Sequence, residues 1–439
     1  MNADMRPIKT AAETALAEAF ASAKARLPGG REVAARREAA FRRFEAGGLP
    51  SRRIEEWKYT DLRALMRDAK PLAGPIEATR SAPPAIADAL PGIDAYRVAI
   101  VNGAYAPGWS DLAGADPGVA LIDLFGWIAD NASEYQELIA QENDLATALN
   151  TAFVTGGVVL RVKKDARVAK PIHLAYALMG DSAVAMYPRT IVLAEPGAQV
   201  TLIETFGGPA GLDYQVNAAL DLIVGDGARV ERVKIGSESA AALHVSTVTA
   251  KIGAKAGYRE FTFTTGSAVT RNQLFLRCAG EGSNVRIAGA NLIKDRQHVD
   301  STLVIDHAAR SCESREVFKS VLEDESRAVF QGKIVVQPQA QKTDGRMMTQ
   351  ALLLSENAEA DNKPELEIFA DDVQCGHGAT AGRLDENLLF YLKARGIPAK
   401  EAEALLIQAF VGEAIDGIAH EGVRDMLGGR VAAWLEARG

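Results

Sequence analysis

Cysteine is scarce in this chain of 439 residues, which contains only Cys278, Cys312 and Cys375. No two of them have the Cys-x-x-Cys spacing of a zinc or redox motif, and three distant thiols cannot build the disulfide framework of a secreted domain. This usage suits a reducing compartment, so we expect a cytoplasmic protein.

Long apolar runs and an excess of basic residues are also missing. No stretch reaches the roughly 18 consecutive apolar residues that a membrane helix needs. The opening segment contains Glu13 and Glu18 and lacks the apolar centre of a signal peptide. The net charge is −8, which disfavours a nucleic-acid surface. We therefore expect neither a membrane nor a nucleic acid as a partner.

Common catalytic signatures are absent as well. The chain has no Gly-x-x-x-x-Gly-Lys-Ser/Thr loop for ATP, no His-Glu-x-x-His zinc motif and no Gly-x-Ser-x-Gly nucleophile motif. These absences exclude a self-contained ATPase and the common hydrolase classes, and we expect a protein that is not an enzyme.

What is present is an ordinary globular composition, 48% hydrophobic and 24% charged, whose periodicity changes twice. Helical spacing dominates residues 1–150 and returns in residues 381–439. In residues 151–380, short alternations rich in Val, Ile and Thr are separated by glycine turns. The sequence therefore predicts three domains with these boundaries. Helices in the first domain are expected at 14–26, 32–45 and 133–150.

Glycines recur through the central region at a nearly constant interval. Gly197, Gly227, Gly257 and Gly282 each precede a strand-like alternation, at separations of 30, 30 and 25 residues. A unit of this length cannot bury its apolar face alone, but stacked units share a continuous core. We predict a mainly β protein, with a right-handed parallel β-helix between helical domains. The alternative is an antiparallel sandwich of the same strands.

The C-terminal segment carries apolar stripes at helical spacing. Leu388 and Leu392 share one helix face, and Leu405, Leu406 and Phe410 lie on the next helix. Such helices could cap the end of the solenoid. They also suit docking into the groove of a partner protein.

The stretch 369–397, FADDVQCGHGATAGRLDENLLFYLKARGI, places Cys375 two residues before His377, where the β pattern gives way to helices. Residues i and i+2 of a strand point to the same side, so a thiol and an imidazole could serve one metal site. Two ligands do not complete a site. The plainer alternatives are a small buried thiol and a histidine that caps a turn.

Other candidate ligands are scattered. His298, His307 and Cys312 lie close enough in sequence to form a metal cluster, although their spacing matches no known motif. Cys278 stands in an apolar alternation and is expected in the core. Trp57 lies in an aromatic and basic element, for which we expect packing between the N-terminal helices and the solenoid.

Several longer sequence segments resemble those of one protein family. The runs AQKTDG (340–345), LLLSENAEADNKPELEIFADDV (352–373) and CGHGATAGRLDE (375–386) are similar to the C-terminal core of the SufB/SufD family of iron–sulfur cluster assembly scaffolds. The segment RRIEEWKYTDL (52–62) resembles the N-terminal element of that family. The chain resembles SufD more than SufB, because Gly378 follows His377 where SufB-type chains have glutamate.

The resemblance implies a scaffold subunit of the SUF system, within a SufBCD complex. It implies a SufB homologue as the partner of the β-helix, a SufC ATPase docked on the C-terminal helices, and a homodimer when SufB is missing. His377 and Cys375 would contact a transient iron–sulfur cluster shared with SufB, and a reduced flavin is a further cofactor of such a complex. The rivals are a β-helix enzyme acting on acidic polysaccharide and a purely structural adaptor without a metal role.

Overall fold

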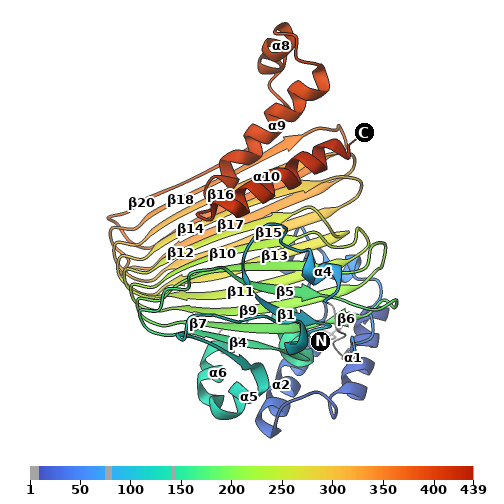
Figure 1. Ribbon diagram of the computed structural model, residues 1–439, viewed down its shortest axis with the longest axis vertical. Coiled ribbons are helices and arrows are strands. Elements are labelled where there is room, and N and C mark those ends of the chain that lie inside the picture. The colour runs from blue at the N-terminus through green and yellow to red at the C-terminus, as the bar shows by residue number, and fades with distance from the viewer. Residues whose placement is uncertain (1–8, 75–81, 140–143, 439) are drawn as a thin grey trace, which may run out of the picture.

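The computed structural model describes residues 9–74, 82–139 and 144–438, and its body is a two-sheet parallel β-solenoid (Figure 1). Sheet I runs in the spatial order β2 (Ala104–Tyr105), β1 (Tyr96–Val101), β5 (Ile172–Ala177), β8 (Gln199–Gly207), β10 (Arg229–Gly236), β12 (Gly257–Thr264), β14 (Asn284–Ile293), β16 (Glu313–Leu322), β18 (Asp344–Leu353) and β20 (Gln374–Gly382). Sheet II runs in the order β19 (Glu359–Ile368), β17 (Arg327–Val336), β15 (His298–His307), β13 (Val269–Cys278), β11 (Leu243–Ile252), β9 (Gln215–Val224), β7 (Pro188–Ala194), β4 (Gly156–Val162) and β3 (Val119–Asp123), and β6 (Ala185–Met186) pairs with β9.

From β7 onward the chain alternates between the two sheets, so each strand up to β18 pairs with the strand two places further along. These pairs are parallel, for example β10 with β12 and β11 with β13. Only the pairs β1–β2 and β3–β4 are antiparallel among the described residues. The predicted parallel β-helix is therefore confirmed, and the antiparallel sandwich is wrong.

The turns that lead from sheet II to sheet I stack along one edge of the solenoid. In each turn, one residue adopts the left-handed backbone conformation and its N–H bonds to the carbonyl of the next turn, as from Gly227 to Ala254 at 2.8 Å. These residues are Gly197, Gly227, Lys255, Gly282, Ser311 and Lys342. The prediction that Gly257 marks a turn was wrong, because Gly257 is the first residue of β12. In that turn Lys255 adopts the left-handed conformation, with φ 53°. The bond from Lys255 N–H to Glu281 O, 2.8 Å long, helps to offset the strain of a side chain there.

The interior of the solenoid is apolar at most positions and charged at a few. Side chains alternate between the inner and outer faces of each strand, as the pleat requires. Arg232, which is 2% exposed, pairs inside with Glu204 at 2.6 Å and with Glu260 at 2.8 Å. Removing one partner of such a buried pair leaves an uncompensated charge, so this cluster constrains the register of β8, β10 and β12.

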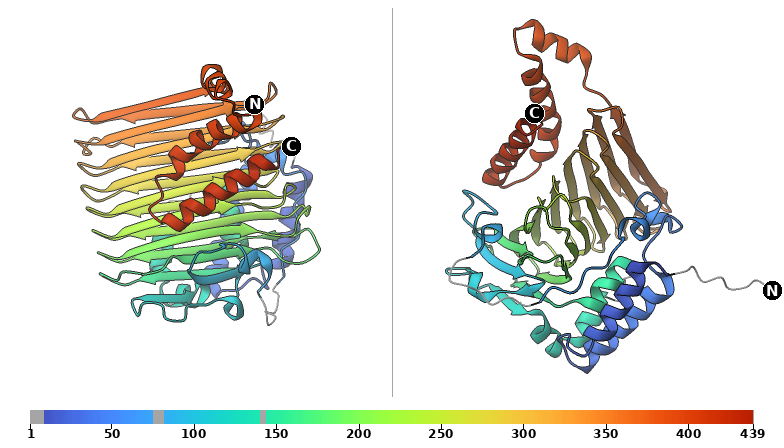
Figure 2. Two further views of the ribbon diagram at one scale, coloured as in Figure 1. Left: turned by 45° about the horizontal axis from the view of Figure 1, so that its top comes forward. Right: turned by 90° about the vertical axis from the view of Figure 1, so that its right-hand side faces the viewer.

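The N-terminal region packs several helices against the outer face of sheet II (Figure 2), but its short helix Pro84–Ala87 contacts strands β5 and β8 of sheet I. Its helices are α1 (Ala11–Ala23), α2 (Arg31–Gly47), α3 (Leu62–Leu65), α4 (Pro84–Ala87), α5 (Leu124–Asp130), α6 (Ala132–Ile139) and α7 (Leu145–Phe153), with short 3-10 turns η1 (Glu55–Trp57) and η2 (Pro107–Trp109). The expected helix at 133–150 corresponds to α6 and α7, and residues 140–143 between them lie outside the described residues. This region also contributes β1, β2 and β3 to the sheets, which helical spacing did not indicate.

Trp57 joins the N-terminal region to the solenoid, as expected. Its ring is buried beneath the guanidinium of Arg271 on β13, which lies 3.8 Å from the ring centroid. The indole N–H donates to Asp144 at 3.0 Å, and Arg271 forms a 2.5 Å ion pair with Asp300 on β15. A cation, an aromatic face and two carboxylates thus hold this contact.

Three helices follow the solenoid: α8 (Glu386–Ala394), α9 (Ala399–Ile415) and α10 (Glu421–Glu436). The last two lie across the outer face of sheet I, whereas α8 projects beyond the solenoid (Figures 1 and 2). On α9 the buried side chains include Ile407, Val411 and Ile415, which pack against sheet I. The apolar stripe predicted through Leu405 and Leu406 is therefore not the buried face of this helix.

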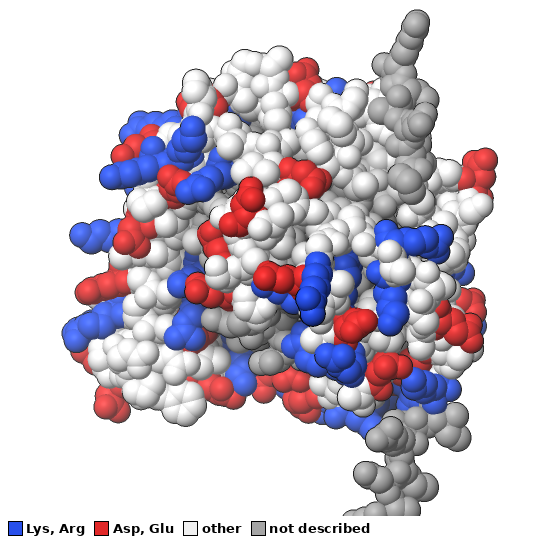
Figure 3. Space-filling model, turned by 90° about the horizontal axis from the view of Figure 1, so that it is seen from below, with Lys and Arg blue, Asp and Glu red and all other residues white. Residues whose placement is uncertain are grey.

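The surface carries charges of both signs. Figure 3 shows lysine and arginine side chains interspersed with aspartate and glutamate on the face seen from below. Within the described part of the chain, no helix combines the length and the apolarity needed to cross a membrane.

Candidate functional site

The solenoid ends in an open coil, which we call the terminal coil and which consists of β19, β20 and the turn between them. Each strand is the last of its sheet, so one edge of its backbone has no strand partner among the described residues. Ile368 and Phe369, at the end of β19, are 41% and 61% exposed. An unpaired strand edge flanked by exposed apolar side chains is a template for pairing with another chain.

Cys375 and His377 both lie on this last strand, β20. In the register with β18, Cys375 is beside Gly345 and His377 is beside Met347. The spacing of two places both side chains on the same side of the strand, as the sequence predicted. The thiol is half-buried and the imidazole is exposed, so both lie at the open end of the solenoid.

The thiol of Cys375 is held in its protonated form. Partial burial raises its pKa above the usual value, and the nearby carboxylates of Asp344 and Glu316 add to this, while a hydrogen bond from the Gly345 backbone opposes it. At neutral pH the isolated chain therefore presents a thiol. A metal ion or a cationic partner would be needed to stabilise the thiolate.

The described residues contain no group of three or more His, Cys, Asp or Glu side chains that could hold a metal ion. Cys375 and His377 are thus a thiol and an imidazole on one strand, and no third side chain of this kind joins them among the described residues. The cluster considered for His298, His307 and Cys312 does not form. His298 bonds to Thr60 of the N-terminal region at 2.8 Å, while His307 lies inside the solenoid and bonds to Ser314 at 3.0 Å.

The remaining thiols are core residues. Cys278 and Cys312 are fully buried inside the solenoid, where the Cys312 thiol donates to the backbone carbonyl of Gly280 at 3.3 Å. Cys278 therefore lies in the core as expected, and Cys312 joins it there.

A buried carboxylic acid lies two coils below His377. The register runs from Glu316 to Met347 and on to His377, and Glu316 is 1% exposed. Neither carboxyl oxygen has a hydrogen-bond partner among the described residues. Burial raises the pKa of Glu316 to about 8, which Ser314 and Arg315 only partly oppose. This acid is therefore mostly protonated at neutral pH.

We expect the stability of the protein to fall as the pH rises through the pKa of Glu316. The folded state keeps this proton up to about pH 8, whereas the unfolded state loses it near the ordinary glutamate pKa of 4.5. The contribution is complete below pH 4.5 and is lost above pH 8, with a total of roughly 3–5 kcal/mol. Urea unfolding at pH 5.5 and 8.5 measures most of this difference. Glu316→Gln should remove most of the difference, and Glu313→Gln, on an exposed position of the same strand, should not. An unchanged pH dependence in Glu316→Gln would contradict this assignment.

The candidate partner-binding residues of the C-terminal helices differ in exposure. Leu388 and Leu405 are 51% and 42% exposed, and Leu392 and Leu406 are half-buried. Phe410 instead packs within the chain, because its ring centroid lies 4.4 Å from the ammonium of Lys319 on β16. The Asp385 side chain caps α8 by accepting the Asn387 N–H at 2.8 Å.

Sequence reasoning missed the largest exposed side chains of this region. Phe390 is 72% exposed and Tyr391 is 52% exposed, both on α8, which buries no residue at all. The sequence did contain a signal, because Phe390 and Tyr391 stand between Leu389 and Leu392. Apolar residues therefore surround this short helix, and a helix that packs on one side only needs one apolar face. With Leu388, these side chains form an apolar surface on a projecting helix.

Residues 177–410 match the family described as "SUF system FeS cluster assembly, SufBD core domain", and residues 12–174 match "SufBD protein N-terminal region". The iron–sulfur cluster assembly protein SufD of Escherichia coli is 32% identical over 395 residues, which covers 88% of this chain and 90% of the relative.

Two further relatives agree. An iron–sulfur cluster assembly SufBD family protein of Synechocystis is 29% identical over 84% of both chains. The iron–sulfur cluster assembly protein SufD of Bacillus subtilis is 29% identical over 64% of both chains. The similarity to the first two relatives therefore extends over both the N-terminal region and the solenoid.

Proposed function

This chain belongs to the SufB/SufD family of SUF-system iron–sulfur cluster assembly proteins, and we propose that it is a SufD-type scaffold subunit rather than an enzyme. The observation that carries the proposal is the terminal coil. It combines an unpaired strand edge, exposed apolar side chains, a thiol and an imidazole at one end of the solenoid. A scaffold that works in the cytoplasm needs these features and needs no catalytic site of its own.

The terminal coil would pair with the matching end of a SufB homologue. The backbone edge of β19 and β20 offers hydrogen-bonding groups, and Ile368 and Phe369 would become buried. When the SufB homologue is missing, two copies of this chain would use the same edge to form a homodimer.

A nascent cluster at that junction would be cargo shared by the two subunits. His377 would provide an exposed imidazole, and Cys375 would provide a thiolate once iron displaces its proton. The ligands that this chain lacks would come from the SufB homologue. Incomplete ligation by each subunit suits a scaffold, because the assembled cluster must later leave.

The ATPase would dock on the projecting C-terminal helix. Leu388, Phe390 and Tyr391 of α8 would enter an apolar groove of a SufC-type subunit, with Leu392, Leu405 and Leu406 at the border of the contact. Phe410 would not take part in this contact, because its ring packs against Lys319 of β16.

Co-expression with SufB and SufC homologues under anaerobic conditions tests both contacts. We expect light scattering to give the mass of one SufB, two SufC and one copy of this chain. Leu388→Asp with Phe390→Asp should remove one SufC and leave a three-chain particle. Ile368→Asp with Phe369→Asp should separate this chain from SufB, because both charges would be buried at the junction. Gln374→Ala, an exposed position on β20, is the control. A wild-type chain that ignores both partners would overturn the proposal.

A further inference from the structure

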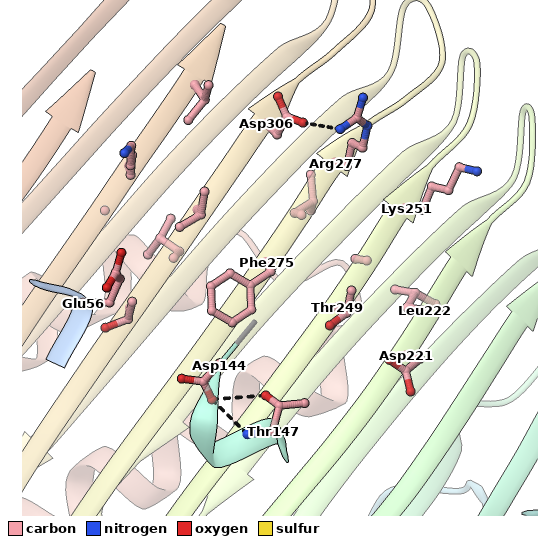
Figure 4. A pocket seen from close by; sticks show the side chains of 18 of the residues that line it. Glu56, Asp144, Thr147, Asp221, Leu222, Thr249, Lys251, Phe275, Arg277 and Asp306 are labelled. Carbon is pink, nitrogen blue, oxygen red and sulfur yellow. Dashed lines mark hydrogen bonds and ion pairs between the residues drawn. The ribbon is translucent and has the colours of Figure 1, made fainter. Parts of the chain in front are cut away.

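A large cleft lies between the N-terminal region and the outer face of sheet II (Figure 4). It encloses about 1040 Å³. Its floor is formed by strands β9, β11, β13, β15, β17 and β19, and its wall by η1, α6 and the beginning of α7. The cleft is separate from Cys375, His377 and α8, so the proposed cluster site and ATPase contact leave it unused.

The floor of the cleft is apolar where it meets the wall. Phe275 on β13 lies next to Val304 on β15 in the strand register, and both are half-buried on the outer face of the sheet. Ile223 on β9 and Val335 on β17 extend this surface. Apolar side chains on an outer face that borders a cleft are typical of a contact surface.

The charges around the cleft are predominantly negative. Its lining contains eight carboxylates, Glu55, Glu56, Glu134, Glu137, Asp144, Asp221, Asp306 and Glu365, and four cations, Lys251, Arg277, Lys333 and Lys363.

Several of these carboxylates already have partners. Arg277 pairs with Asp306 at 2.9 Å, and Lys363 pairs with Glu55 at 2.5 Å and Glu365 at 3.2 Å. Asp144 accepts hydrogen bonds from Trp57 and Gln273. The contacts of Lys363 with Glu55 and of Gln273 with Asp144 join the floor of the cleft to its wall.

Three exposed wall carboxylates have no ion-pair partner among the described residues. Glu134 and Glu137 on α6 and Glu56 on η1 are exposed and form no ion pair with another described residue. An occupant of the cleft would meet apolar groups below and uncompensated negative charge at the side. Polyanions and phosphate-bearing ligands are disfavoured there by repulsion. The cleft therefore gives no support to an enzyme acting on acidic polysaccharide.

We propose that this cleft binds a basic amphipathic helix of a partner protein. The apolar face of the helix would cover Phe275 and Val304, and its lysine or arginine side chains would face Glu134 and Glu137. Strands β9 to β19 span five inter-strand spacings, or about 24 Å. A helix of about 16 residues has this length. The proposal does not depend on the scaffold function, because the isolated chain contains the whole cleft.

Fluorescence anisotropy with the full chain tests the proposal. The probe is a labelled peptide of about 16 residues of leucine and lysine in which the leucines have helical spacing. We expect Glu134→Lys with Glu137→Lys to weaken binding at least ten-fold, and Phe275→Gln to weaken it at least five-fold. The matched control is Glu18→Lys with Glu281→Lys, which makes the same charge change at exposed positions outside the cleft and should change binding less than two-fold. A Leu/Glu peptide of the same pattern should not bind.

Two outcomes would overturn the proposal. Equal weakening by the cleft variant and the control variant would show that only net charge matters. Equal binding of a Leu/Lys peptide with scrambled spacing would show that no helix face is recognised. Hydrogen exchange of the wild-type chain tests the same contact without substitutions. Bound peptide should slow the exchange of backbone amides in α6, β13 and β15.

Discussion

Replacing His377 by alanine should reduce cluster assembly in the complex with SufB and SufC homologues at least ten-fold. The imidazole is exposed on the last strand, so its loss removes a donor to iron and leaves the packing of the chain intact. Anaerobic reconstitution with ferrous iron and sulfide, followed by absorbance of the cluster, measures the effect.

Two controls separate a ligand from a structural residue. Gln374→Ala changes an exposed side chain on the same strand and should assemble clusters at the wild-type rate. The His377→Ala complex should keep the wild-type mass in light scattering. Full cluster assembly by His377→Ala would favour the structural adaptor without a metal role.

Replacing Trp57 by alanine should lower the free energy of unfolding by about 3–5 kcal/mol, the usual cost of deleting a buried aromatic ring. The ring is 2% exposed and its loss also uncovers the Arg271 guanidinium and removes the hydrogen bond to Asp144. Urea denaturation measures the change. Limited proteolysis should then cut first within residues 9–74, because Trp57 joins that region to the solenoid.

Trp57→Phe is the informative comparison for this contact. It keeps an aromatic face under Arg271 and removes only the indole N–H, so we expect a loss of about 1–2 kcal/mol. Tyr59→Ala, at a half-buried neighbouring position, should cost less than Trp57→Ala. If Trp57→Ala and Tyr59→Ala lost equal stability, the contact between Trp57 and Arg271 would not be the main contact between the N-terminal region and the solenoid.

The course of the chain through the solenoid could be predicted because it depends on local rules. Alternating Val, Ile and Thr specify strands, and glycines at Gly197, Gly227 and Gly282 permit the left-handed turns. The interval was misjudged at one turn, where Lys255 takes the place that a glycine was expected to fill. There a bond to the neighbouring turn, which no local pattern reveals, makes a lysine tolerable.

The helices after the solenoid show the opposite case. Their existence follows from the spacing of leucines, but several of those leucines are not the buried residues. Ile407 and Val411 face sheet I, while Leu388 and Phe390 remain exposed on α8. Which face of an apolar helix becomes buried depends on where the helix meets the sheet, and that is a property of the assembled chain.

By itself, the sequence determined the stacked parallel strands, the shared side of Cys375 and His377, and the membership of a family of cluster assembly proteins. These follow from residue spacing, from the two-residue repeat of a strand and from long shared words. Only the tertiary structure decided that these two residues lie on the last strand of sheet I, that Trp57 lies beneath Arg271, and that a cleft with an acidic wall lies between α6 and sheet II. Such features join residues that are hundreds of positions apart, and the contacts that create them form only when the coils have stacked.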